Sequence, residues 1–297
     1  MGNDSLVSIV LPFLDAEEFI GEAIDSVFAQ THDEWELLLV DDGSTDGSSE
    51  IARQCVSRYP TRVRYLQHEG HENRGTSATR NLGLAQARGS HVAFLDADDL
   101  WLPSKLREQL MILRSHAGVA MVYGPAERFY EDDASRVEIQ KLGVPLNRVI
   151  HPPSLVALFL RNQGAVPSPS AILVKRAVVG EIGAFEEKFR GMYDDQVFYA
   201  KLCLRAPVFV TGSVWYRRRR HPRALGPVAS ARGQYHASRH AFLLWLGEYF
   251  EQQGVTTPRL WRGLRRQMLP YRHPYLWGVL APVGRAGRRA TRFLRSP

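Results

Sequence analysis

Short apolar runs alternate with longer amphipathic segments along the first 123 residues. The runs are rich in β-branched and aromatic side chains, which is typical of buried strands; they lie at residues 8–12, 35–41, 63–67, 91–96 and 119–123. Segments with apolar residues at helical spacing lie between them, at residues 16–30, 45–59, 76–88 and 103–115. Strands that alternate with helices in this way predict an α/β fold, with a mostly parallel sheet and helices on both faces.

The regular alternation weakens after residue 123. Residues 127–166 are polar and contain prolines, so they are predicted to be irregular apart from a helix at 154–161. Such a segment is a candidate for binding a second substrate, because binding residues are often carried on loops. The pattern then returns with predicted elements at 170–174 (strand), through 183 (helix), 195–205 (helix) and 208–216 (strand).

Acidic side chains follow two of the predicted strands. Asp41 and Asp42 end the second strand, and Asp96, Asp98 and Asp99 end the fourth. In parallel α/β sheets, ligands bind beyond the carboxyl ends of the strands. Carboxylates crowded at such a site need a cation or hydrogen-bond donors, and a divalent metal is the simplest partner. Because side chains alternate along a strand, Asp96 and Asp98 are expected to share a face and Asp99 to point elsewhere.

Composition and charge narrow the class of protein. A chain of 297 residues with 44% hydrophobic content can form one large domain or a domain with an appendage. The net charge of +7 is uneven: residues 212–297 hold seventeen arginines, no lysine and two acidic residues, against 21 basic and 29 acidic residues before them. There is no secretory signal and no apolar run of roughly 18 residues, so a cytoplasmic protein is expected.

Several ordered blocks together resemble the family 2 glycosyltransferases, which are inverting enzymes with a GT-A fold that use nucleotide-diphosphate sugars. The blocks are VSIVLP at 7–12, DDGSTD at 41–46, NRG at 73–75, FLDADD at 94–99, GAFEE at 183–187 and YDD at 193–195. The similarity covers about the first 220 positions. One block alone is weak evidence, and their order makes the resemblance specific.

The resemblance implies a nucleotide-sugar site. Asp41 would accept a hydrogen bond from the nucleotide base, in a pocket lined by Pro12 and Glu17, and Asp96 would face the ribose. The other residues implied in binding the nucleotide sugar are Arg74, Arg80 and Ala97. Where family members commonly carry tyrosine and asparagine, this chain has Leu14 and Asp15, which removes an aromatic platform for the base and leaves both UDP- and dTDP-sugars as expected donors.

The resemblance also implies a metal and a catalytic base. Asp98 would hold Mn²⁺ or Mg²⁺ against the diphosphate, since a hard cation binds carboxylate and phosphate together. His221 is the second metal candidate, from a segment similar to the family's tyrosine-arginine-x-histidine element but with extra arginines. Asp195 aligns with the general base, and the acid before it is Asp194 rather than the commoner glutamate. One carboxylate suffices for a single inverting displacement.

These expectations define a catalytic domain at residues 1–220, divided into a nucleotide-sugar-binding half (1–123) and an acceptor-binding half (124–220), and a basic, mostly helical extension at 221–297. The expected function is metal-dependent transfer of a sugar to a hydroxyl of a glycan or lipid-linked saccharide, in cell-surface polysaccharide assembly. The alternative is a noncatalytic protein that binds nucleotide sugars or nucleic acid and acts through its basic tail.

Each motif also has a purely structural interpretation. The residues after Asp41 suit a turn, Asp98 and Asp99 could cap a helix near residue 103, and Asp194 with Asp195 could be a solvated helix start. Arginines such as Arg74 and Arg80 usually face water. The tail interleaves arginine with tryptophan, tyrosine and leucine, which suits an anionic, cytoplasmic membrane face, nucleic acid, or an appendage that packs on the domain.

Overall fold

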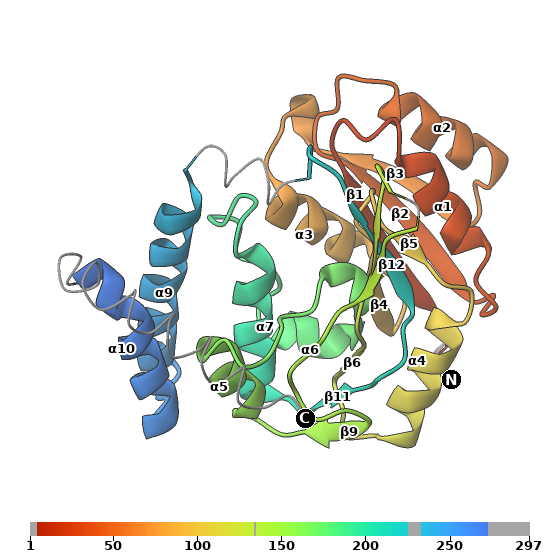
Figure 1. Cartoon of the computed structure of the whole chain (residues 1–297). Coiled ribbons are helices and arrows are strands. Elements are labelled where there is room, and N and C mark those ends of the chain that lie inside the picture. The colour runs from red at the N-terminus through yellow and green to blue at the C-terminus, as the bar shows by residue number, and fades with distance from the viewer. Residues whose placement is uncertain (1–4, 134, 225–232, 273–297) are drawn as a thin grey trace. The chain divides into compact units, whose positions relative to one another are not determined.

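The structure is a computed structural model that describes residues 5–133, 135–224 and 233–272 (Figure 1). Contacts between Cα atoms divide the chain into two compact units, Met1–Tyr235 and His236–Pro297. The boundary expected after residue 220, and the division of the catalytic domain into two halves, stay predictions.

Unit 1 contains all the strands of the described residues. They are β1 (Val7–Phe13), β2 (Trp35–Asp41), β3 (Val63–Gln67), β4 (His91–Phe94), β5 (Leu100–Trp101), β6 (Met121–Tyr123), β7 (Glu127–Tyr130), β8 (Val137–Ile139), β9 (Arg148–Ile150), β10 (Leu173–Lys175), β11 (Val208–Val210) and β12 (Tyr216–Arg220). The helices before residue 210 are α1 (Ile20–Phe28), α2 (Ser48–Arg58), α3 (Thr76–Gln86), α4 (Lys105–Ser115), α5 (Ser154–Leu160), α6 (Arg176–Glu181) and α7 (Asp194–Arg205), with 3₁₀ turns η1 (Glu69–His71) and η2 (Pro169–Ala171).

The strands form two sheets. The large sheet has eight strands in the order β3-β2-β1-β4-β10-β6-β11-β9, and its pairs are parallel except β4–β10, β10–β6 and β11–β9. The small sheet has four strands in the order β5-β12-β7-β8. Figure 1 shows helices on both sides of the large sheet, with α1 and α2 on one side and α3 and α6 on the other. The predicted α/β fold with a mostly parallel sheet is confirmed.

The core of unit 1 lies along β1 and β2, where every residue is buried. Strands covered on both faces read as continuous apolar runs, which is why these two were found from the sequence. Helix α3 approaches them closely because Gly83 has no side chain: a Cβ there would lie 2.5 Å from Cγ1 of Val10 and 3.2 Å from Cγ2 of Val40. The turn before α3 therefore lies near the carboxyl ends of both strands.

Some predicted elements are wrong in detail. Residues 170–174 are not one strand, because η2 is followed by β10, which runs antiparallel to its neighbours. Residues 208–216 are not one strand either: β11 belongs to the large sheet, and β12 begins at residue 216 in the small one. The segment 127–166, expected to be mostly irregular, supplies β7, β8 and β9. Strands β7 and β9 pair with the distant β12 and β11, which local periodicity does not report, and β8 pairs with β7.

The fourth strand ends earlier than predicted. Strand β4 stops at Phe94, and the chain then turns, with the amide of Asp99 donating to the carbonyl of Asp96 at 3.0 Å. The expected strand alternation from Asp96 to Asp98 is therefore wrong. The turn nevertheless sets Asp99 apart from the other two carboxylates: the side chains of Asp96 and Asp98 are 28% and 31% exposed, whereas Asp99 is buried.

Unit 2 consists, in its described part, of α10 (Pro258–Arg272) and nearly all of α9 (Tyr235–Gln252). Helix α10 is amphipathic, with one buried stripe formed by Leu260, Gly263, Leu264 and Met268. The arginines expected at 285, 288, 289, 292 and 295, and the aromatic segment 273–283, lie outside the described residues. Among the described helices, none is long and apolar enough to cross a membrane.

Candidate active site

The first acidic loop is organised by Asp41 at the end of β2. One carboxylate oxygen accepts hydrogen bonds from the amides of Gly43 (3.1 Å) and Ser44 (2.8 Å), and the other accepts from the hydroxyls of Tyr65 (2.8 Å) and Ser49. Burial raises the pKa of Asp41, but these donors outweigh it and hold the pKa below its usual value. Asp41 has no exposed surface. The contact of Asp41 with a nucleotide base stays a prediction. The base would have to displace the hydroxyl of Tyr65 or Ser49 from this carboxylate.

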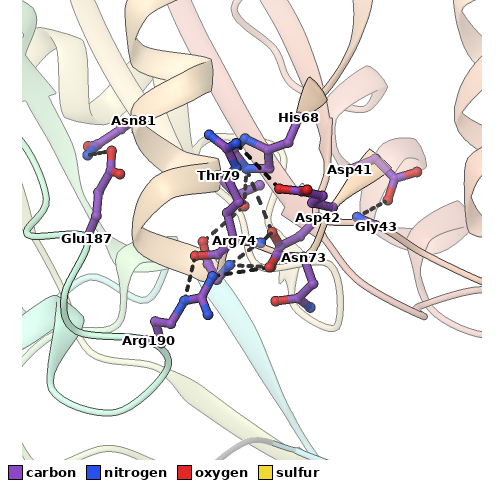
Figure 2. A network of polar contacts seen from close by, with 12 residues as sticks. Asp41, Asp42, Gly43, His68, Asn73, Arg74, Thr79, Asn81, Glu187 and Arg190 are labelled. Carbon is purple, nitrogen blue, oxygen red and sulfur yellow. Dashed lines mark hydrogen bonds and ion pairs between the residues drawn. The ribbon is translucent and has the colours of Figure 1, made fainter. Parts of the chain in front are cut away.

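The second carboxylate of this loop, Asp42, holds a neighbouring loop in place (Figure 2). It accepts hydrogen bonds from the amides of Arg74 (2.8 Å) and Gly75 (3.0 Å), and His68 lies 3.7 Å away. Arg190 holds the same loop from its other side, donating to the carbonyls of Asn73 (3.1 Å) and Arg74 (3.0 Å). The backbone before α3 is thus fixed, while the Arg74 side chain is 50% exposed and faces solvent.

Residues 14–17 close over the first acidic loop. Asp15, with a positive φ of 45°, accepts hydrogen bonds from the amide (2.7 Å) and hydroxyl (3.2 Å) of Thr45. Glu17 accepts a hydrogen bond from the amide of Gly47 at 2.9 Å. Pro12 is buried within β1. The structure therefore places Glu17 beside the loop that follows Asp41, as a backbone acceptor, and pairs Pro12 with Val40 of β2. The roles of both residues in lining a nucleotide pocket stay predictions.

The second acidic cluster is joined to the start of α7 by Arg80. This arginine is 3% exposed and donates to Asp96 (2.7 Å) and Asp194 (2.5 Å). The two carboxylates raise the pKa of Arg80 despite its burial. The structural interpretation in which Arg80 faces water is therefore wrong. Three segments that are distant in the sequence meet here because one planar guanidinium can bind two carboxylates.

Asp98 faces His221. A carboxylate oxygen of Asp98 lies 3.1 Å from Nε2 of His221, and Nδ1 of that ring is buried without a hydrogen-bond partner. Ala97, between Asp96 and Asp98, is buried in the turn. Helix α4 begins at Lys105 with no side-chain cap, so capping by Asp98 or Asp99 is not observed.

The pair formed by Asp98 and His221 fits a hard divalent cation that takes only one or two ligands from the protein. Adjacent donors in octahedral coordination at about 2.1 Å are about 3.0 Å apart, close to the observed separation. Among the described residues, no group of three or more acidic, histidine or cysteine side chains converges on a cation position. Mg²⁺ and similar ions commonly take one or two protein ligands and complete their shell with water and substrate phosphates.

Asp195 lies in the first turn of α7, next to the carboxylate held by Arg80. Burial, followed by the neighbouring charge of Asp194, raises the pKa of Asp195 to about 7. Burial likewise raises the pKa of Asp194, although Arg80 opposes this. A carboxylate with a pKa near neutrality suits general base catalysis, because it is available as the base and still accepts a proton readily. The interpretation of this pair as a solvated helix start is wrong for Asp194, which is buried.

Sequence reasoning missed two groups at this site. Tyr199 lies one helical turn after Asp195; its hydroxyl is buried without a hydrogen-bond partner, and burial, followed by the charges of Asp195 and Asp96, raises its pKa. Despite burial, the charge of Asp99, followed by those of Asp96 and Asp195, raises the pKa of Arg218 in β12. The i to i+4 spacing would have indicated Tyr199. Arg218 is indicated only once residues 216–220 are known to be a strand.

The arrangement defines a class of protein: an α/β fold of the GT-A type with carboxylates gathered beyond β2 and β4. Solved structures share this fold. Staphylococcus aureus TarS 1–349 in complex with UDP-GlcNAc matches with a TM-score of 0.62 and 19% identity over 89% of this chain and 80% of that one. A mannosyltransferase, PcManGT from Pyrobaculum calidifontis in complex with GDP-Man and Mn²⁺, matches with a TM-score of 0.61 and 19% identity over 97% and 79%.

The family follows from sequence comparison. The Glycosyl transferase family 2 profile matches residues 8–183, more than half of the chain, so the chain belongs to this family. The putative teichuronic acid biosynthesis glycosyltransferase TuaG of Bacillus subtilis is 30% identical over 177 residues, 60% of this chain and 65% of that protein. The Escherichia coli UDP-Glc:alpha-D-GlcNAc-diphosphoundecaprenol beta-1,3-glucosyltransferase WfgD is 36% identical over 126 residues, 42% of this chain and 47% of that protein. The chain thus matches less than two thirds of either relative.

Proposed function

We propose that this protein is a metal-dependent inverting glycosyltransferase that moves a sugar from a nucleotide-diphosphate donor to a hydroxyl of a glycan or lipid-linked saccharide. The observation that carries the proposal is the bridge from Asp96 through Arg80 to Asp194, because it brings the second acidic cluster next to Asp195. Residues 1–123 would bind the donor, and residues 124–220 the acceptor. The relatives TuaG and WfgD support a role in assembling cell-surface polysaccharide.

In this mechanism Asp195 accepts the proton of the acceptor hydroxyl while that oxygen attacks the anomeric carbon. Arg80 keeps Asp194 and Asp96 in place, so the base and the donor subsite keep their relative positions. Asp98 and His221 would hold Mn²⁺ or Mg²⁺. When bound, the cation supplies positive charge for the leaving diphosphate. UDP- and dTDP-sugars are the donors we expect, with Asp41, Pro12, Glu17, Arg74 and Ala97 around the nucleotide.

The metal assignment predicts a nucleotide-specific thermal shift. Wild type is expected to be stabilised by one nucleoside diphosphate among UDP, dTDP and GDP with Mn²⁺ or Mg²⁺, and to lose most of that shift with a chelator. Asp98→Asn should remove the metal-dependent part, because an amide is a poor ligand for a hard cation. Asp132→Asn, at an exposed carboxylate, is the matched control. An equal shift in Asp98→Asn and wild type would contradict the assignment.

We further propose that unit 2 attaches the protein to an anionic membrane, which suits a lipid-linked acceptor. Helix α10 contains no acidic residue, and the side chains opposite its buried stripe are exposed. These exposed side chains include Arg259, Arg262, Arg265, Arg266, Leu269 and Arg272. Arginines near an anionic surface contribute about 1 kcal/mol each. The exposed face of the helix therefore has the basic charge of an electrostatic membrane contact, while its apolar stripe is already buried in the protein.

Vesicle binding tests this anchor. Replacing Arg259, Arg262 and Arg266 with glutamine is expected to weaken binding to vesicles with 30 mol % phosphatidylglycerol by about a hundredfold, the equivalent of about 3 kcal/mol. Binding of wild type should also fall steeply with salt. Neutralising three exposed arginines of unit 1 is the matched control; they are Arg107, Arg114 and Arg161. If both triple variants bind alike, α10 is not the anchor, and preference for RNA over vesicles would favour the nucleic-acid alternative.

A further inference from the structure

An aromatic ring packs against the histidine of the proposed metal pair. The centroid of the Phe19 ring lies 4.7 Å from that of His221, and the two ring planes are tilted by 50°. Phe19 is 7% exposed and directly precedes α1, whereas His221 directly follows β12. The contact therefore joins the beginning of the first helix to the end of the last strand of the described residues.

The orientation of the His221 ring is not fixed by a second hydrogen bond. Its Nε2 faces Asp98 at 3.1 Å, while Nδ1 is buried and has no hydrogen-bond partner within the described part of the chain. In metal sites the second ring nitrogen of a histidine usually donates to a carboxylate or carbonyl, which sets the orientation of the ring. The packing against Phe19 is therefore what restricts rotation of this imidazole.

Two arginines hold the Phe19 ring in turn. The guanidinium carbons of Arg219 and Arg223 lie 5.0 and 5.3 Å from its centroid, within the range of cation–π contacts. Arg219 also donates to Glu22 at 2.6 Å. Arg223 donates to Glu18 at 2.7 Å, so both arginines are tied to the beginning of α1.

Arg219 extends the same cluster to Asp98. Its Nε donates to the backbone carbonyl of Asp98 at 3.3 Å, and its side chain is 9% exposed. Arg219 and His221 are two residues apart at the end of β12, so their side chains lie on the same side of the chain. Phe19 and Arg219 therefore support both members of the pair, one through the imidazole and the other through the backbone that carries the carboxylate.

We propose that Phe19 is a positioning residue for the divalent cation: it holds the imidazole of His221 with Nε2 toward Asp98 before the cation binds. A ligand that is already oriented loses less rotational freedom on binding, so the affinity is higher. A site with only two protein ligands depends on the orientation of each. The inference rests on the proposed function, which assigns Asp98 and His221 to the cation.

Binding of Mn²⁺ tests this role, followed by electron paramagnetic resonance with and without the nucleoside diphosphate selected by the thermal-shift screen. Phe19→Leu keeps an apolar side chain but removes the ring, and it is expected to raise the dissociation constant of Mn²⁺ about tenfold. The ¹⁴N coupling that a bound imidazole gives to the Mn²⁺ spin should weaken in parallel. Phe19→Tyr keeps the ring and should retain most of the affinity and of the coupling.

Phe28→Leu is the matched control, because it removes a ring at the other end of α1, where Phe28 packs against Trp35 and Tyr59. This control should bind Mn²⁺ as wild type does. In a His221→Ala background, Phe19→Leu should cause no further loss, since two changes that act through one group are not additive. Thermal unfolding verifies that each variant is folded, and Phe19→Met is the second ringless variant if Phe19→Leu does not fold.

The inference is wrong if the ringless variant keeps the Mn²⁺ affinity and ¹⁴N coupling of wild type, or if Phe28→Leu loses as much. It is also wrong if Phe19→Leu weakens Mn²⁺ binding equally with and without His221, because the effect then does not pass through the imidazole. Wild type alone tests the proposed function. Absence of Mn²⁺ binding removes the metal assignment, whereas Mn²⁺ binding without ¹⁴N coupling leaves Asp98 as a ligand and overturns the role of Phe19.

Discussion

Asp195→Asn is expected to lower kcat by about 10²- to 10⁴-fold, because the asparagine keeps the shape of the side chain but cannot accept the proton of the acceptor hydroxyl. Donor affinity should stay within about twofold of wild type, since the binding contacts assigned to the donor lie elsewhere. Turnover measured with the donor found in the thermal-shift screen, together with the nucleotide dissociation constant, separates the two effects. A variant that keeps wild-type turnover would contradict Asp195 as the base.

The pH dependence gives the same assignment a second test. The pKa of Asp195 is raised to about 7, so below this pH the base is protonated and inactive. We expect kcat/KM to fall about tenfold per pH unit below about 7 and to level off above it. Stability responds in the opposite direction: the folded state holds this proton more tightly than the unfolded chain, so the contribution of Asp195 to the unfolding free energy is lost as pH rises from about 4 to about 7. Asp195→Asn, which cannot ionise, should not show that loss.

Arg80→Met is expected to have the largest effect on stability. It leaves Asp96 and Asp194 without their shared guanidinium, and removing one partner of a buried ion pair costs about 3–5 kcal/mol. The unfolding free energy from urea titration should therefore fall by a large share of the total. Methionine matches the length of the lost side chain, so little of the effect should come from a cavity.

The exposed pair of Arg136 and Glu138 provides the control for Arg80. Their side chains are 53% and 46% exposed, so Arg136→Gln should cost less than about 1 kcal/mol. The loss caused by Arg80→Met should also be smaller at pH 5 than at pH 8, because protonation removes the charge from the buried Asp194. Equal losses in the two variants, or a loss that does not change with pH, would show that the buried pairs do not hold the site together.

The sequence by itself determined those helices and strands whose residue pattern is recorded within a single short segment. Strands β1 and β2 are buried on both faces, so each appears as an uninterrupted apolar run with Asp41 at the predicted carboxyl end. Helices α3 and α7 were predicted almost to their observed ends. The ordered acidic blocks were enough to indicate the family, because each block keeps its own short-range spacing.

The tertiary structure decided the contacts between distant segments. The bridge from Asp96 through Arg80 to Asp194 joins positions up to 114 residues apart, and the pair of Asp98 and His221 spans 123 residues. No periodic pattern records such a pairing, since burial of a charge depends on which partner the fold brings to it. Sequence reasoning missed Arg218 for the same reason. The direction of its side chain is set by the pairing of β12 with β7, two strands that local propensity did not predict.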